Sequence, residues 1–431
     1  MLLAGIGFGI LFALCFLGVP LAIGMLMVGL GGFAYVRGWD ASVIMMSQQI
    51  LDMAMSEGMA VIPLFIVMGA FIHRSGLSGD LYQAARAWVG HLRGGLAQAT
   101  LGASGAFAAV CGSSVASAAT MAKVTLPEMK RYGYDDGFAC ATVAAGGTLG
   151  ILIPPSVPMV IYGILTQSDI SKLFIAGIVP GVVLMLMYMA TAWGIVVVDP
   201  SKGRPAEVLR IGVRLRALGK TWAVGALFLV VLGGMYTGIF TPSEGGGVGA
   251  AGAFFFMVVR GRAQIALVRS ALLDAAHTTA AILLVGCGAL VFNNFLTIAG
   301  LTNYLVDWIQ SLNVPPLGII AAMCLIYIVL GCIFDSLAMI FLTIPVFFPI
   351  VVGLHLDPIW FGIVVVIVVE LGLITPPIGI NVFIVKSLAP EGVSTWKVFA
   401  SVLPFVVANL LCLTLIVLVP KLSLWLPSFM K

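Results

Sequence analysis

A short stretch decides the fold of this sequence: Cys111-Gly112-Ser113-Ser114-Val115-Ala116-Ser117-Ala118-Ala119-Thr120. It is small and hydroxylated, but the apolar arms around it, 101–110 and 121–126, are each shorter than the roughly 20 residues that a membrane-spanning helix needs. Two short arms joined by a Gly/Ser tip are typical of a re-entrant helical hairpin, whose irregular backbone must be covered by protein or by a water-filled cavity. Such a tip favours an ion site, because carbonyl and hydroxyl oxygens replace the water around an ion. The alternative is a helix-packing surface of small residues.

The composition is that of a membrane protein. Hydrophobic residues make up 61% of the 431 residues and charged residues only 9%, whereas soluble domains contain about 25% charged residues. The apolar runs are long and lack the alternation of a β-barrel, so we expect an all-α polytopic membrane protein. The net charge of +4 is spread over connecting loops, which argues against binding to nucleic acid.

The two halves of the chain carry the same motifs. Gly112 and Ser117 have the same spacing as Gly331 and Ser336, and a Gly followed by Pro-Pro occurs at 150–155 and again at 372–377. Interrupted helices at matching positions of two halves are the best sequence indication of a transporter's binding site. We therefore expect a first repeat at 1–198 with a hairpin at 95–129, a connector at 199–221, and a second repeat at 222–431 with a hairpin at 315–352.

Each repeat is expected to contain one re-entrant hairpin and five membrane crossings, one of which is the broken helix that follows the hairpin. An odd number of crossings makes the repeat inverted, so that the two halves cross the bilayer in opposite directions. Within the first repeat, 43–72 is expected to form one long apolar helix, and 73–93 a polar, basic connection.

Lysine and arginine predict the orientation in the membrane. If the connector 199–221 is cytoplasmic, all but four of the 21 Lys and Arg residues also lie on that side, as the positive-inside rule requires. The four exceptions are Arg37, Lys172, Lys421 and Lys431. Both termini then face the outside, the first hairpin enters from the cytoplasm, and the second enters from the outside.

The hairpin tips and the broken helices offer oxygen ligands of the kind that coordinate Na⁺ in transporters and channels. Asp335 is an ionisable group at the predicted midplane and is therefore a candidate ligand, although it is also placed to cap a helix that begins at Ser336. Glu370 is either a second coordinating acid or a residue hydrogen-bonded between the halves. The predicted Na⁺ ligands are Gly112, Ser113, Ser114, Ser117, Thr148 and Gly150 in the first half, and Gly331, Asp335, Ser336, Thr375 and Gly379 in the second.

Broken helices also present N-terminal ends, whose partial positive charge attracts anions. Pro155 and Ser156 open one such half-helix, and Asn381 lies one turn into the other, where its amide can hydrogen-bond a carboxylate. These three residues are predicted to bind substrate. For Asn381 an interhelical hydrogen bond is an equally good interpretation.

Motifs for other chemistry are missing from the sequence. It contains no HExxH, no GxSxG and no Gly-Lys-Ser/Thr phosphate loop. We therefore predict that the chain is not an enzyme and has no cofactor, with Na⁺ as the coupling ion. An intramembrane enzyme is the weakest alternative.

Three segments resemble the large membrane subunit of tripartite ATP-independent periplasmic (TRAP) transporters: the tip at 112–116 and the broken helices at 146–156 and 373–381. The resemblance extends over essentially the whole chain. It implies a multi-pass protein of the bacterial inner membrane that takes up an organic acid with Na⁺ by an elevator motion. It also implies two partners, a periplasmic substrate-binding protein and a small four-helix membrane subunit. The runner-up is a Na⁺- or H⁺-coupled dicarboxylate carrier that needs no binding protein.

Overall fold

The computed structural model describes residues 2–311 and 314–430, and this part of the chain consists of helices and loops without a strand. Among the described residues, six helices are long and apolar enough to cross a membrane, or seven if the bent pair at 211–236 is one span. These observations confirm the predicted all-α membrane class, whereas the number and direction of the crossings stay a prediction. The ends of the predicted repeats, Met1 and Lys431, lie outside the described residues.

The first half begins with four helices, the second pair of which replaces the single helix predicted at 43–72. The chain breaks at Ser56, so this prediction was wrong. The predicted connection at 73–93 is also largely helical. The helices are α1 (Leu2–Phe16), α2 (Leu21–Arg37), α3 (Trp39–Met55), α4 (Glu57–Ser75), α5 (Leu77–Val89), α6 (Gly95–Cys111), α7 (Ser114–Arg131), α8 (Asp136–Leu152), α9 (Val157–Thr166) and α10 (Ile170–Val198).

The connector contains a short 3-10 turn, η1 (Pro200–Lys202), and the helix α11 (Ile211–Gly219). The second half follows the same plan as the first, with one long helix where the first half has α3 and α4. Its helices are α12 (Trp222–Tyr236), α13 (Pro242–Val259), α14 (Ile265–Ile298), α15 (Leu301–Ser311), α16 (Pro316–Gly331), α17 (Ser336–Gly353), α18 (Pro358–Gly372), α19 (Ile380–Leu388), α20 (Thr395–Leu418), α21 (Lys421–Leu424) and η2 (Pro427–Phe429).

Capping residues set the ends of the hairpin arms. Gly112 adopts a left-handed conformation (φ +66°) after α6, which a residue with a side chain rarely adopts. The Ser113 hydroxyl then accepts a hydrogen bond from the Ala116 N–H at 3.3 Å and starts α7. In the second hairpin, the Asp335 carboxylate accepts from the Leu337 N–H at 3.3 Å and starts α17. Each tip is therefore a helix end followed by a helix beginning.

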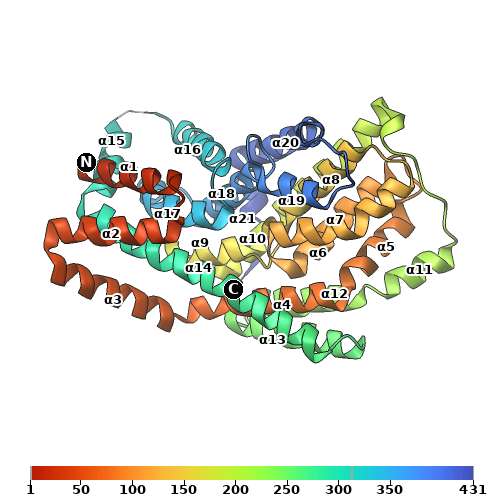
Figure 1. The fold of residues 1–431 in the computed structure, drawn as a ribbon, viewed down its shortest axis with the longest axis horizontal. Helices are drawn as coiled ribbons and strands as arrows, with labels where there is room; N and C mark the ends of the chain where they lie inside the picture. The colour runs from red at the N-terminus through yellow and green to blue at the C-terminus, as the bar shows by residue number, and fades with distance from the viewer. Residues whose placement is uncertain (1, 312–313, 431) are drawn as a thin grey trace.

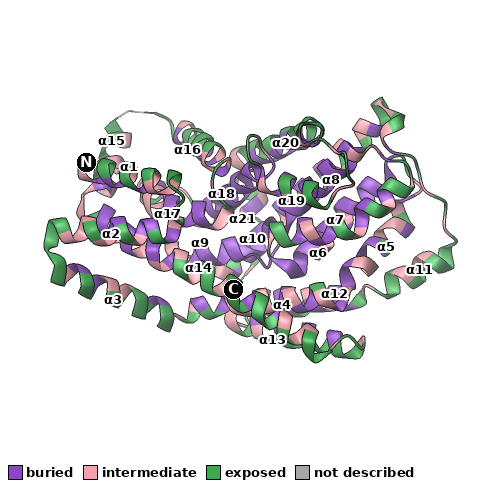
Figure 2. Cartoon of the chain, in the orientation of Figure 1, coloured by how far each residue is buried: buried purple, intermediate pink, exposed green. Residues whose placement is uncertain are grey.

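In the middle of the molecule, elements of the first half pack directly against the corresponding elements of the second half. The second arm of each hairpin packs on the short half-helix of the other half, α7 on α19 and α17 on α9. The helices α8 and α18 are buried along almost their whole length (Figure 2), as expected for helices that are apolar on every face. We call the two hairpins (α6–α7 and α16–α17) and the two broken helices (α8–α9 and α18–α19) the core.

Long helices surround the core, and we call α2, α4, α13 and α14 the frame. In the frame α2 packs on α14, and α4 packs on both α13 and α14. Figure 1 shows α14 running obliquely across the molecule, with α2 beside one end and α13 near the other. The frame touches the core where α4 packs on α6 and α9, and where α14 packs on α17.

An ion pair outside the buried region also joins the two halves. The Lys397 ammonium lies 2.6 Å from the Asp135 carboxylate, which caps α8. Burial tends to raise the pKa of Asp135, but the Lys397 ammonium and the N–H of Phe138 hold it below its usual value.

Candidate functional site

A cavity of about 340 Å³ lies between the two hairpin tips and the frame helices α4 and α14. This volume is within the range of small-molecule sites, roughly 300–1,000 Å³. Core and frame therefore both contribute to one cavity, and most of its lining is apolar.

Four helices begin at this cavity. Residues in the first turn of α7, α9, α17 and α19 line it: Ser114, Val157, Ser336 and Ile380. The first N–H groups of a helix have no partner within the helix, and the helix dipole gives this end a partial positive charge. Two hairpins and two broken helices thus direct four N-terminal ends to one space, an arrangement that favours an anion.

At the first tip, small residues allow the hairpin to approach the broken helix closely. A Cβ atom at Gly150 would lie 2.7 Å from both the Ser113 carbonyl oxygen and the Ser117 hydroxyl oxygen. Ser117 is fully buried, and its hydroxyl has no hydrogen-bond partner among the described residues. Gly112, Ser113, Ser117 and Gly150 are therefore gathered in one place, with an uncommitted oxygen between them.

The second tip meets its own broken helix in the same way. The backbones of Gly331 and Gly372 are so close that a Cβ atom on Gly331 would lie 2.9 Å from the Cα of Gly372. The Cys332 thiol donates to the Pro376 carbonyl at 3.2 Å. Asp335 and Ser336 line the cavity, and Asp335 is exposed to it while it also caps α17.

A buried polar network joins the first hairpin to the second half. The Ser114 hydroxyl lies 3.0 Å from the Gly147 carbonyl and 3.3 Å from a Glu370 carboxyl oxygen, and it accepts a hydrogen bond from the Asn381 amide at 2.7 Å. Glu370 and Asn381 are fully buried. The Oε1 of Glu370 and the Oδ1 of Asn381 have no partner among the described residues. The network therefore contains two further free oxygens.

The remaining predicted ligands lie outside the cavity lining. The Thr148 hydroxyl bonds to the Ala145 carbonyl and the Tyr188 hydroxyl, on the α10 side of α8. Thr375 donates to the Leu371 carbonyl. Pro155, Ser156 and Gly379 also lie outside the lining, although Val157 and Pro158, next to the first two, belong to it.

The comparison with protein families assigns the chain. Residues 8–422 match the model of the tripartite ATP-independent periplasmic transporter, DctM component. This chain belongs to that family. It is therefore a multi-pass protein of the bacterial inner membrane and a transport subunit, which confirms the resemblance and the prediction that it is not an enzyme.

Two relatives and one solved structure place this TRAP permease more closely. It is 34% identical over 372 residues to the C4-dicarboxylate TRAP transporter large permease protein DctM of Pseudomonas aeruginosa, with 86% of each chain covered. It is 32% identical over 416 residues to the isethionate TRAP transporter permease protein DctMQ of Oleidesulfovibrio alaskensis, covering 95% of this chain and 64% of that protein. The Alcanivorax borkumensis YdaH transporter shares its fold, with a TM-score of 0.63, 15% identity and 89% of each chain covered.

Part of the cavity wall was not predicted from the sequence. His73 and Arg74 at the end of α4, and Asp274 and Thr278 on α14, line the cavity beside the hairpin tips. In the sequence His73 and Arg74 follow an apolar run and resemble an interfacial loop. Only the packing of α4 on α14, about 200 positions apart in the chain, brings them to the TRAP permease's central cavity.

Proposed function

We propose that this TRAP permease couples the entry of Na⁺ to the uptake of an organic acid. The observation that carries the proposal is the convergence of four helix N-termini on one cavity between the hairpin tips. These N-termini stabilise a carboxylate in the cavity, so that no lysine or arginine side chain of the core is needed to bind it. The names of the two relatives, one for C4-dicarboxylate and one for isethionate, support an organic anion as the substrate class.

Na⁺ is proposed to bind at the two tips. In the first, the Ser117 hydroxyl and the Ser113 carbonyl face Gly150, where small residues leave oxygen atoms free to coordinate an ion. In the second, Asp335 and Ser336 supply a carboxylate and a hydroxyl beside the Gly331–Gly372 contact. An ion at either tip lies next to a helix N-terminus that faces the cavity, so ion and anion stabilise each other by Coulomb attraction.

The core is proposed to move as a unit against the frame, carrying the tips and the anion across the membrane. This division is supported by the dense packing within the core and by its contacts with the frame through α4 and α14. A periplasmic binding protein and a small membrane subunit are the proposed partners, because the family is tripartite. Membership of this family argues against the stand-alone dicarboxylate carrier.

Reconstitution tests the coupling. The permease, its small subunit and its binding protein are placed in liposomes, and uptake of radiolabelled succinate is followed under an inward Na⁺ gradient without ATP. We expect succinate to accumulate above its external concentration, and to equilibrate at most when K⁺ replaces Na⁺ at the same membrane potential. Uptake that is unchanged in Na⁺-free buffer would refute Na⁺ coupling. Uptake by this chain alone would favour the stand-alone carrier.

A further inference from the structure

Arg74 occupies a distinct position in the cavity. It lies in the last turn of α4, and its guanidinium forms an ion pair with Asp274 of α14. Both residues line the cavity. The Arg74 side chain is 22% exposed and the Asp274 side chain 65% exposed, so the acid is the more accessible partner of the pair.

The other basic side chain in the cavity wall is already engaged by the core. The His73 ring lies 2.7 Å through Nδ1 from the Thr120 hydroxyl of α7. Among the described residues of the cavity wall, Arg74 is therefore the one that carries a permanent positive charge. Its ion-pair partner, Asp274, is largely exposed. Guanidinium groups bind carboxylates through two parallel N–H groups, which makes arginine well suited to an organic acid.

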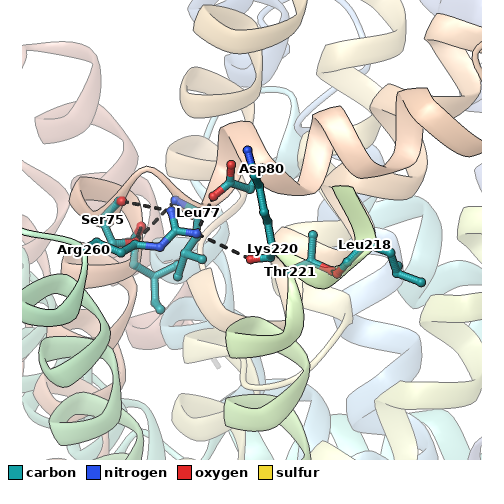
Figure 3. Close-up of polar contacts among 8 residues, drawn as sticks. Ser75, Leu77, Asp80, Leu218, Lys220, Thr221 and Arg260 are labelled. Carbon is teal, nitrogen blue, oxygen red and sulfur yellow. Dashed lines mark hydrogen bonds and ion pairs between the residues drawn. The ribbon is translucent and has the colours of Figure 1, made fainter. Parts of the chain in front are cut away.

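The turn that follows Arg74 is fixed by a polar cluster (Figure 3). Arg260, at the end of α13, donates to the Asp80 carboxylate, to the Ser75 carbonyl at 3.5 Å and to the Lys220 carbonyl at 3.5 Å. These contacts tie the α4–α5 turn to the second half of the chain. Arg74 is thus presented by an anchored part of the frame, which limits the reorganisation that ligand binding requires.

We propose that Arg74 is a substrate-binding residue, which exchanges the Asp274 carboxylate for a carboxylate of the transported organic acid. Asp274 acts as an internal competitor that occupies the guanidinium when the cavity is empty. The substrate then bridges the core and the frame, with one anionic group at the helix N-termini and a second at Arg74. This inference rests on the proposed function, since it requires an organic anion in the cavity.

The two residues of the pair have opposite expected effects on substrate affinity. Arg74→Gln removes the cation, so the succinate concentration for half-maximal uptake should rise about tenfold or more. Asp274→Asn removes the competitor, and the same concentration should fall about threefold, as expected for a partly exposed pair. In the double variant Asp274→Asn should have no further effect, because the competition no longer exists.

Reconstituted uptake of succinate by the complete three-component system measures these values, and Glu128→Gln is the matched control. Glu128 pairs with Arg86, outside both the cavity lining and the cluster that holds the α4–α5 turn, so its variant should keep the wild-type succinate dependence even if its stability falls. Thermal melting of each purified variant is measured in parallel. A purely structural ion pair predicts that Arg74→Gln and Asp274→Asn both lower stability and leave the succinate dependence unchanged.

That result, or an unchanged half-saturation value in a folded Arg74→Gln permease, would overturn the inference and leave the proposed function intact. If the wild-type system carries neither succinate nor isethionate under a Na⁺ gradient, the proposed function fails, and this inference fails with it.

Discussion

Asp335 has two roles in the structure, and they make different demands on its side chain. One carboxylate oxygen caps α17 through the Leu337 N–H, and the side chain is also exposed to the cavity between the tips. Capping needs only a hydrogen-bond acceptor, which asparagine also provides. Binding of Na⁺ needs the negative charge as well, because the charge offsets that of the cation where water is scarce.

Substitution of Asp335 separates the two roles. Asp335→Asn should keep the melting temperature of the permease but raise the Na⁺ concentration for half-maximal uptake, by roughly a hundredfold if most of the ~2.5 kcal/mol cost of a charge at the bilayer midplane is recovered through the ion. Asp335→Ala should in addition lower the melting temperature, since the cap is lost. The measurement is the Na⁺ dependence of reconstituted succinate uptake. An unchanged Na⁺ requirement in an active Asn variant would exclude Asp335 from the ion site.

Between elements, the polar network around Ser114 joins α7 to α18 and α19. Ser114 has a single hydroxyl hydrogen, so it cannot donate both to the Gly147 carbonyl and to Glu370 at the same time. The Ser114 hydroxyl has a partner for its hydrogen and for both lone pairs when the group at position 370 is itself a donor to it. A neutral donor also avoids the cost of a charge that is fully buried without a cationic partner among the described residues.

Two substitutions of Glu370 test this interpretation. Glu370→Gln provides a neutral donor of the same size, so the permease should melt at or above the wild-type temperature. Glu370→Ala leaves a cavity and removes one hydrogen-bond partner of the buried Ser114 hydroxyl, and it should cost about 2–4 kcal/mol of unfolding free energy. Thermal melting of the purified protein in detergent compares the three. If Gln destabilises as strongly as Ala, a charged carboxylate is needed there, which would indicate a bound cation instead.

The positions of the breaks in the core helices could be predicted because they depend on local chemistry. Gly112 and the Pro-Pro pairs at 154–155 and 376–377 disfavour a continuous helix, and the structure breaks the chain at those positions. The lengths of the first hairpin's arms were underestimated, because α7 begins at Ser114, within the predicted tip at 111–120. The break at Ser56 could not be predicted, since the run 43–72 is apolar on both sides of it. The helix α5 was missed because its polar residues conceal a buried stripe that includes Leu77, Leu81 and Ala84.

In the candidate site too, the residues set by local sequence motifs could be predicted and those set by helix packing could not. The residues of the tips follow from motifs that repeat within the sequence, and five of them line the cavity: Gly112, Ser113, Ser114, Asp335 and Ser336. The wall formed by Arg74 and Asp274 depends on how α4 packs against α14, and no local pattern encodes a contact across 200 positions. The orientation of hydroxyls is equally non-local, because Thr148 turns toward Tyr188 of α10.

Over the whole molecule, the packing of the two halves is reciprocal. The helix α8 packs on α20 of the other half, and α18 packs on α10. Each of these two contacts is the counterpart of the other with the halves interchanged, as a two-fold relation between the halves requires. The side on which the connector 199–221 lies decides the orientation of both halves in the bilayer, and with it the side from which each hairpin enters.

The final prediction concerns that location. All but four of the 21 Lys and Arg residues fall on the connector's side, so the connector should be cytoplasmic. A single cysteine is introduced into a cysteine-free permease at Glu207 in the connector or at Gln167 between α9 and α10, both exposed. A membrane-impermeant maleimide should label position 167 in intact spheroplasts and position 207 only after lysis. Labelling of position 207 in intact spheroplasts would place the connector in the periplasm. The first hairpin would then open to the periplasm and the second to the cytoplasm.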